Sequence, residues 1–189
     1  MLKKLIILFC ICIPLCGCVA SALVVGATAG GAVVYDKRSF KTINNDRHAT
    51  EIAQTLIDHN RKLKKHSHIT VATFNHIMLL VGQAQTAELR DLAYNLVSNT
   101  KNVQRIYNEI SIGPSTSFMR RTNDTWLTTK IKTSMLTEKG LNSTQIKVVT
   151  ENKVVYLLGL VSRKQAALAT NVARRVSGVK KVVQVFQYT

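Results

Sequence analysis

Hydrophobic and polar positions follow one pattern twice in the part of the chain beyond residue 44. The segment ITVATFNHIMLLVG at 69–82 matches IKVVTENKVVYLLG at 146–159 at a constant spacing of 77 residues (146 minus 69). In each copy, two short β-branched runs surround a polar turn, which is typical of a β-hairpin. We expect Gly82 and Gly159 to end the second strand of each hairpin. The four strands are predicted at 69–74, 77–81, 146–150 and 154–158.

Apolar residues at helical spacing precede each hairpin. Before the second hairpin, an apolar helical stripe is formed by Leu127, Ile131 and Met135, and Gly140 is predicted to end that helix. Before the first hairpin, Asp46 is predicted to cap a helix in which Ile52 corresponds to Ile131. The apolar stripe of that helix is predicted to be Ala49, Ile52, Ala53, Leu56 and Ile57.

Each hairpin is followed by a second helical pattern and a last strand. The helices are expected around 89–97 and 168–176, and the strands at 105–112 and 181–188. A helix between two strands of one sheet implies a right-handed crossover. We therefore predict an α+β fold of two tandem small αββαβ domains, each a three-stranded sheet with two helices on one face. Their predicted bounds are 44–112 and 122–189, with a linker at 113–121 that begins with Gly113-Pro114.

The N-terminus has the features of a processing signal. Lys3 and Lys4 precede an eleven-residue apolar stretch, Leu5–Leu15, which is too short for the roughly 20 residues of a spanning helix. Leu15-Cys16-Gly17-Cys18 then resembles a bacterial lipobox, in which the cysteine sulfur takes a diacylglycerol. This predicts a lipoprotein signal peptide at 1–17, lipidation of Cys18 and a lipid-anchored tether at 18–43. An uncleaved apolar anchor is the alternative, because residues 19–34 are also rich in Ala, Val and Gly.

Cysteine usage limits the chemistry of the folded part. All four cysteines lie within the first eighteen residues, so neither a disulfide framework nor a cysteine-ligated zinc site is available beyond them. A chain that folds without thiol oxidation suits the periplasm.

Basic residues greatly outnumber acidic ones. The chain has 26 Lys and Arg against 10 Asp and Glu, a formal net charge of +16, which becomes +14 if Lys3 and Lys4 leave with the signal. Such a charge indicates an anionic partner, although a basic face can also serve solubility alone. The candidate basic face comprises Arg61, Lys62, Lys64, Lys65, Arg174, Arg175, Lys180 and Lys181. We expect the first four of these, in the segment 61–66, to lie in an exposed loop.

The second unit resembles the BON domain. The resemblance rests on Leu157-Leu158-Gly159, on the Ala-rich helix that follows, and on Val176-Ser177-Gly178-Val179-Lys180-Lys181-Val182. Two such domains behind a lipobox resemble the dual-BON outer-membrane lipoproteins of Gram-negative bacteria. The first unit departs from the pattern, with Thr100-Lys101-Asn102-Val103 where the family usually has a Gly-Val pair.

The resemblance implies a location and a function. The protein would be anchored by acyl chains such as palmitate at the periplasmic face of the outer membrane, and would support envelope integrity. It would bind anionic phospholipid through the first helix of its second domain. The site residues implied in this way are Trp126, Leu127, Lys130, Lys132, Thr133 and Leu136.

Helical geometry independently supports part of this site. Trp126 lies off the core stripe of its helix, in line with Lys130 and Thr133. An indole beside an ammonium suits the lipid headgroup layer, where an amphipathic ring meets anionic phosphate. The alternative is that Trp126 packs against the linker or the other domain.

Other classes of function find little support. Four histidines lie between His59 and His76, and His66 and His68 could share a metal, but no Cys or nearby carboxylate pair completes a ligand set. No nucleophile elbow, phosphate loop or HExxH motif occurs, so we expect no catalytic residues, no cofactor and no metal. With 6% aromatic residues and an extracytoplasmic signal, nucleic acid is not the expected partner. The alternative to lipid binding is a protein–protein adaptor that docks on outer-membrane assembly or peptidoglycan-linked machinery.

Overall fold

The computed structural model describes residues 36–189. The predicted signal peptide, Cys18 and the tether as far as residue 35 lie outside the described residues. The first described helix, α2 (Phe40–His59), begins four residues before the predicted domain start at 44. Its N-cap is Ser39, whose hydroxyl accepts a hydrogen bond from the Thr42 amide at 3.0 Å. The prediction that Asp46 caps this helix was therefore wrong.

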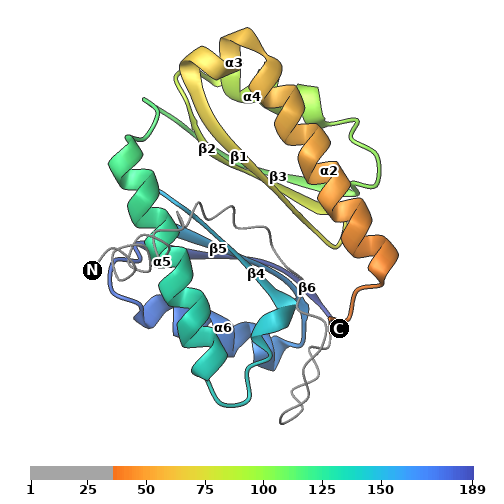
Figure 1. Ribbon diagram of the computed structural model, residues 1–189, viewed down its shortest axis with the longest axis vertical. Coiled ribbons are helices and arrows are strands. Elements are labelled where there is room, and N and C mark those ends of the chain that lie inside the picture. The colour runs from red at the N-terminus through yellow and green to blue at the C-terminus, as the bar shows by residue number, and fades with distance from the viewer. Residues whose placement is uncertain (1–35) are drawn as a thin grey trace, which may run out of the picture. The chain divides into compact units, whose positions relative to one another are not determined.

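The first domain has the predicted topology around a central β2 (Figure 1). Strand β2 pairs antiparallel with β1 and parallel with β3. The segment expected as a basic loop is instead a short helix, α3, because Asn60 caps it and Leu63 is buried. After α2, the elements are α3 (Arg61–His66), β1 (Ser67–Phe74), β2 (Ile77–Ala84), α4 (Ala87–Val97) and β3 (Arg105–Ile112).

The second domain repeats this order, with β5 at the centre of its sheet. Its first helix begins at Phe118, so residues 118–121 of the predicted linker are helical. The two sheets with their helices confirm the predicted α+β fold. The elements are α5 (Phe118–Thr137), the 3₁₀ turn η1 (Ser143–Gln145), β4 (Ile146–Glu151), β5 (Val154–Val161), α6 (Arg163–Arg175) and β6 (Lys181–Tyr188).

The first helices of the two domains correspond at a spacing of 78 residues, not the 79 expected. Ala53 and Ile131 occupy equivalent positions, and each is 0% exposed. Ile52 is 38% exposed and Leu56 is 40% exposed, so both leave the predicted stripe. The pairing of Ile52 with Ile131 was wrong because two of the four buried residues of α2 are alanine, and the small Ala53 takes the position of Ile131.

A buried aspartate holds the hairpin turn of each domain. Asp46 accepts hydrogen bonds from the amides of Asn75 (2.6 Å) and His76 (2.9 Å). Asp124 does the same for Asn152 and Lys153. All four turn residues have positive φ, between 47° and 65°, a conformation that costs a residue with a side chain about 1–2 kcal/mol. The carboxylate offsets that cost by satisfying both turn amides.

The glycines of the repeat permit a close approach between backbones. A Cβ on Gly82 would lie 1.9 Å from the carbonyl oxygen of His68, and one on Gly159 would lie 2.8 Å from that of Gln145. The strands continue past both glycines, to Ala84 and Val161, so neither glycine ends its strand as expected. This packing explains why both copies of the repeat have glycine here.

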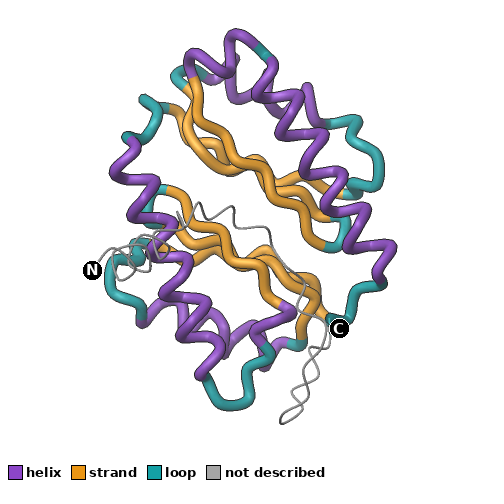
Figure 2. The backbone as a smooth tube through the Cα atoms, viewed as in Figure 1, coloured by secondary structure: helices purple, strands orange, loops and turns teal. Residues whose placement is uncertain are grey.

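The faces of the two sheets that carry no helices pack against each other (Figure 2). All eight residues of β2 are buried, because helices cover one face and the second sheet covers the other. Hydrogen bonds flank this apolar layer: Gln83 Nε2 donates to Glu151 Oε1 at 2.8 Å, and Gln187 Nε2 donates to the Asn75 carbonyl at 3.2 Å. The layer is built mainly from Phe74, Ile77, Leu79, Val81, Tyr156, Leu158 and Val185.

Candidate membrane-binding surface

The outward face of α5 carries large apolar side chains that the fold does not cover. Trp126 is 55% exposed, and Met119, about two turns earlier on the same face, is 76% exposed. The Lys130 ammonium lies 4.9 Å from the centroid of the Trp126 ring, a cation–π distance. An indole, a thioether and an ammonium thus lie together on one exposed surface. The alternative was that Trp126 packs against the linker or the other domain. No such packing buries the Trp126 side chain.

The structure separates the predicted lipid-binding residues into three groups. Trp126, Lys130 and Thr133 share the outward face of α5, in line with the helical geometry. Leu127 is 0% exposed in the core of the second domain, so it is unavailable to lipid and its inclusion is corrected. Lys132 and Leu136 lie on another side of the helix, where both line a small apolar groove.

Sequence reasoning missed two apolar residues at the start of α5. Phe118 and Met119 were assigned to the linker, yet both lie in the first turn of the helix and each is 76% exposed. The available signal was Ser117, whose hydroxyl accepts a hydrogen bond from the Arg120 amide as a helix N-cap does. These two residues extend the exposed apolar surface from Trp126 toward the helix start.

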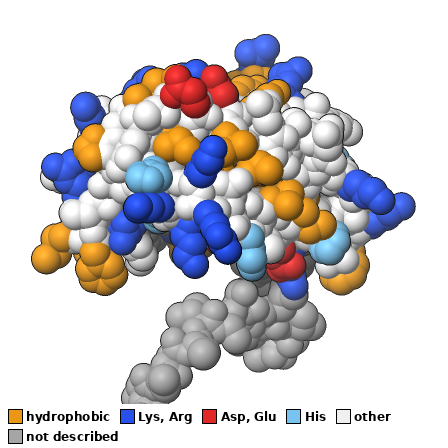
Figure 3. Space-filling model, turned by 90° about the horizontal axis from the view of Figure 1, so that it is seen from above, with side chains coloured by type: hydrophobic (Ala, Val, Ile, Leu, Met, Phe, Trp, Pro, Cys, Tyr) orange, Lys and Arg blue, Asp and Glu red, His pale blue; other side chains and the backbone are white. Residues whose placement is uncertain are grey.

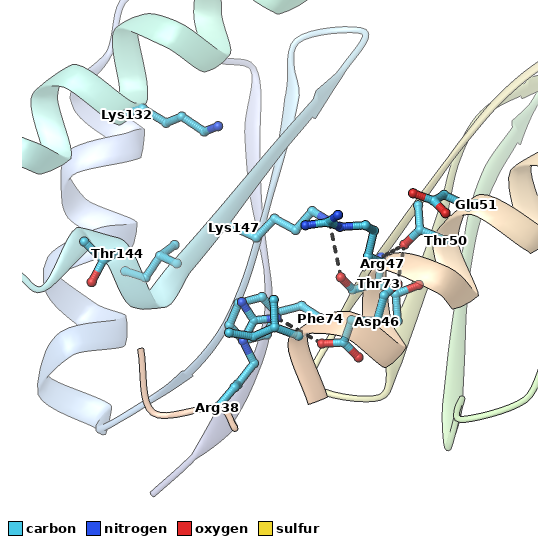
Figure 4. A pocket seen from close by; sticks show the side chains of 12 residues that line it. Arg38, Asp46, Arg47, Thr50, Glu51, Thr73, Phe74, Lys132, Thr144 and Lys147 are labelled. Carbon is cyan, nitrogen blue, oxygen red and sulfur yellow. Dashed lines mark hydrogen bonds and ion pairs between the residues drawn. The ribbon is translucent and has the colours of Figure 1, made fainter. Parts of the chain in front are cut away.

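A cleft of about 480 Å³ lies where α2 and β1 of the first domain meet α5 and β4 of the second (Figure 4). Lys147 lines it, and its ammonium donates a hydrogen bond to the Thr73 carbonyl at 3.2 Å. Burial, and secondarily the charge of Arg38, holds the pKa of Lys147 below its ordinary value. Arg38 itself is paired with Asp36 at 2.8 Å and with Asp46 at 2.9 Å.

The candidate basic residues are exposed but do not form one surface. Four of them lie on α3, two lie at the end of α6, and Lys180 and Lys181 lie just before and at the start of β6. Figure 1 shows α3 and α6 on opposite outer sides of the two sheets. Figure 3, viewed from the α3 side, shows Lys and Arg side chains in several separate groups. These basic residues therefore do not form a single docking face.

Two of the four histidines between 59 and 76 contact nearby backbone carbonyls. His59 Nδ1 lies 2.9 Å from the Thr55 carbonyl, and His76 Nδ1 lies 2.9 Å from the Asn102 carbonyl. Among residues 36–189, no group of three or more potential His, Cys, Asp or Glu ligands lies close enough to hold a metal ion. Over the same described range, no helix is both long and apolar enough to cross a membrane.

Comparisons with known proteins agree on a family. A model described as "BON domain" matches residues 44–114 and 123–189. The chain is 35% identical over 187 residues to a protein named outer membrane lipoprotein DolP from Haemophilus influenzae, an alignment that covers 99% of this chain and 96% of that one. It is 37% identical over 153 residues to a protein named 21 kDa hemolysin from Actinobacillus pleuropneumoniae, with 81% and 79% covered.

A solved structure of CdsD, described as a structural protein of the type III secretion system of Chlamydia trachomatis, is 15% identical with a TM-score of 0.30. It covers 76% of this chain and 63% of that chain, and at this TM-score it supports no argument. The two family matches and the near full-length relative decide the assignment. The chain belongs to the dual BON-domain family of lipid-anchored outer-membrane lipoproteins.

Proposed function

We propose that this outer-membrane lipoprotein binds anionic phospholipid through the outward face of α5 and thereby supports envelope integrity. The observation that carries the proposal is the exposed pair of Trp126 and Lys130 on a helix of the second BON domain. Indole rings favour the headgroup layer, and a base near an anionic membrane contributes about 1 kcal/mol. The role is one of binding, without catalysis, cofactor or metal.

Two contributions to this binding have different signatures. Attraction between Lys130 and lipid phosphate weakens with salt, because the Debye length falls from about 10 Å at 0.1 M to about 3 Å at 1 M. Insertion of the Trp126 ring and of Met119 depends on apolar burial and resists salt. Lys130→Glu should therefore reduce selectivity for anionic over neutral lipid, whereas Trp126→Ala should reduce the binding that remains at high salt.

Vesicle co-sedimentation tests this proposal with a chain that lacks residues 1–18. Because the described elements begin at Phe40, this truncation keeps every one of them. Lys164→Glu on α6 is the matched control, since it makes the same charge change at an exposed position on a different helix. If the Lys130 and Lys164 variants lose binding equally, net charge alone drives association and α5 is not the site.

The lipid anchor is a separate part of the proposal. We propose that Cys18 is the mature N-terminus and carries the acyl chains, since it completes a lipobox directly after an apolar stretch. Cys18→Ala should leave the signal uncleaved and the chain unacylated. Mass spectrometry that finds a free thiol on Cys18 of the mature wild-type protein would contradict this assignment.

If α5 does not bind lipid, a non-enzymatic adaptor remains the competing function. Such a protein would dock on outer-membrane assembly or peptidoglycan-linked machinery, and the exposed side chains of α5 would then meet a protein partner. The vesicle experiments separate these two functions, because an adaptor surface has no requirement for anionic headgroups.

A further inference from the structure

Three basic side chains from both domains line the cleft of about 480 Å³ described above. Arg47 comes from α2, Lys132 from α5 and Lys147 from β4, and Figure 4 shows Lys147 reaching toward Arg47. In the described part of the chain, none of the three forms an ion pair. Like charges held together without a carboxylate partner repel one another, and a bound anion would relieve that repulsion.

Acidic groups in the cleft neutralise these bases only in part. Asp46 is engaged by Arg38 at 2.9 Å and by two turn amides. Glu51, one helical turn after Arg47, is the other carboxylate of the lining. The lining contains four bases (Arg38 and the three above) and two acids, which leaves a formal charge of +2. The electrostatic character of the cleft is thus positive.

A buried hydroxyl at the same place lacks a partner. Thr73 lines the cleft and is 2% exposed, and its Oγ1 has no hydrogen-bond partner among residues 36–189. Its backbone is fully used: the amide donates to Thr50 Oγ1 at 3.0 Å, and the carbonyl accepts from Lys147. That hydroxyl is closed off from solvent, so a ligand in the cleft does not reach it. The contribution of Thr73 to the cleft is its carbonyl, which holds the Lys147 ammonium in place.

An apolar groove adjoins the cleft. This groove has a volume of about 190 Å³ and shares Lys132, Thr144 and Ile146 with the cleft. Its other walls include Met135, Leu136 and Val148. A ligand that fits both spaces has an anionic oxygen-rich group joined to an apolar segment. The cleft volume falls within the roughly 300–1,000 Å³ typical of small-molecule sites.

We propose that the inter-domain cleft binds the phosphate of a single anionic phospholipid molecule, with Arg47 and Lys147 at the phosphate, Lys132 between the cleft and the adjoining groove, and the start of an acyl chain in that groove. This site differs from the Trp126 surface of the proposed function, which contacts a bilayer from outside. The first domain contributes to it through Arg47 and Thr73, so the site exists only when the two sheets are packed together.

Titration with monomeric dihexanoylphosphatidylglycerol, below its micelle concentration, tests this site by calorimetry and by amide shifts of residues 73 and 147. The protein is the chain without residues 1–18. We expect Arg47→Gln and Lys147→Gln each to weaken binding at least tenfold. Lys164→Gln, an exposed base on α6 that does not line the cleft, should leave it unchanged. Arg47 is itself exposed, so its variant retains the fold, and unchanged affinity in that variant would overturn the proposal.

Two further ligands distinguish the sources of phosphate. Dihexanoylphosphatidylcholine, whose headgroup has no net charge, should bind at least tenfold more weakly. Inorganic phosphate should compete only at concentrations at least a hundredfold higher, because it leaves the apolar groove empty; equal affinity would overturn the assignment to lipid.

Trp126→Ala should keep the binding of the monomeric lipid while it loses vesicle binding. A joint loss would mean that the cleft is not a separate site. The opposite result is that the protein still binds the monomeric lipid while Trp126→Ala and Lys130→Glu leave vesicle binding unchanged. That result would support the cleft and contradict the proposed function.

Discussion

Asp124 is predicted to be one of the most important single polar residues for the stability of the second domain. It is 4% exposed, and its two carboxylate oxygens accept from different amides, Asn152 at 2.7 Å and Lys153 at 2.9 Å. A hydrogen bond to a charged group contributes about 1.5–3 kcal/mol, so the pair contributes about 3–6 kcal/mol. Because Asn152 and Lys153 are exposed, water can replace the carboxylate in part, and we expect Asp124→Ala to cost about 3 kcal/mol.

Asp124→Asn probes the same interaction more narrowly. The amide keeps one acceptor oxygen but places an NH₂ group opposite the second turn amide, so we expect a loss of at least about 1.5 kcal/mol. Asp91→Ala is the control, because Asp91 is 59% exposed and its pair with Arg90 is worth at most about 0.5 kcal/mol.

Urea unfolding followed by far-ultraviolet circular dichroism measures these differences at pH 7. Trp126 is too exposed to report on unfolding, so fluorescence is not the appropriate signal. A cost below about 1 kcal/mol for Asp124→Ala, with unchanged m-value, would refute the assignment of the carboxylate as the clamp of the turn.

Three further predictions concern the sheets. Gly82→Ala should destabilise by more than about 2 kcal/mol, and more than Gly159→Ala, because its φ of +134° and its 1.9 Å approach to a backbone carbonyl both oppose a side chain. Leu158 lies between the sheets and is 1% exposed, so Leu158→Ala should lower the free energy of unfolding by about 2–5 kcal/mol. Leu136 is 69% exposed, so Leu136→Ala should change it by no more than about 0.5 kcal/mol. Equal losses would contradict the sheet-to-sheet packing. Burial raises the pKa of Tyr156 to about 12, from about 10 in the unfolded chain. The free energy of unfolding, measured by urea titration, should therefore stay constant up to about pH 10 and fall between about pH 10 and 12. The fall should be smaller in Tyr156→Phe.

The repeated hairpins could be predicted from the sequence because their information is local. Alternating β-branched residues, a polar turn and a glycine occur within fourteen residues in each copy, and the strands form at these places. The role of the glycine was not predictable, since it depends on the carbonyl of His68 on the neighbouring strand or of Gln145 in the turn before it.

The helix starts were less predictable because their first turns carry no apolar stripe. Residues 118–121 do not continue the buried stripe of the helix, and only Ser117 marks the cap. In α2 the small Ala49 and Ala53 face the core while Ile52 lies outside, so the larger side chain misled the assignment of the stripe. Hydrophobic size alone does not decide which side of an amphipathic helix is buried.

The packing of the two domains and the cleft between them could not be predicted from the sequence. The continuous apolar run at 77–81 is typical of a strand buried on both faces, and this was the one available signal. Which surface covers the second face depends on residues about 77 positions away. Arg47, Lys132 and Lys147 are likewise far apart in sequence, so no motif could bring them together in advance.

The emission spectrum of Trp126 tests the central claim most directly, because it is the only tryptophan in the chain and lies at the centre of the proposed surface. The chain without residues 1–18 is titrated with phosphatidylglycerol vesicles and, as the control, with phosphatidylcholine vesicles. The account predicts a blue shift on saturation with the anionic lipid and little or no shift with the neutral lipid. An unchanged spectrum across a saturating titration of anionic vesicles, with the fold intact by circular dichroism, would contradict lipid binding through α5 and favour the adaptor.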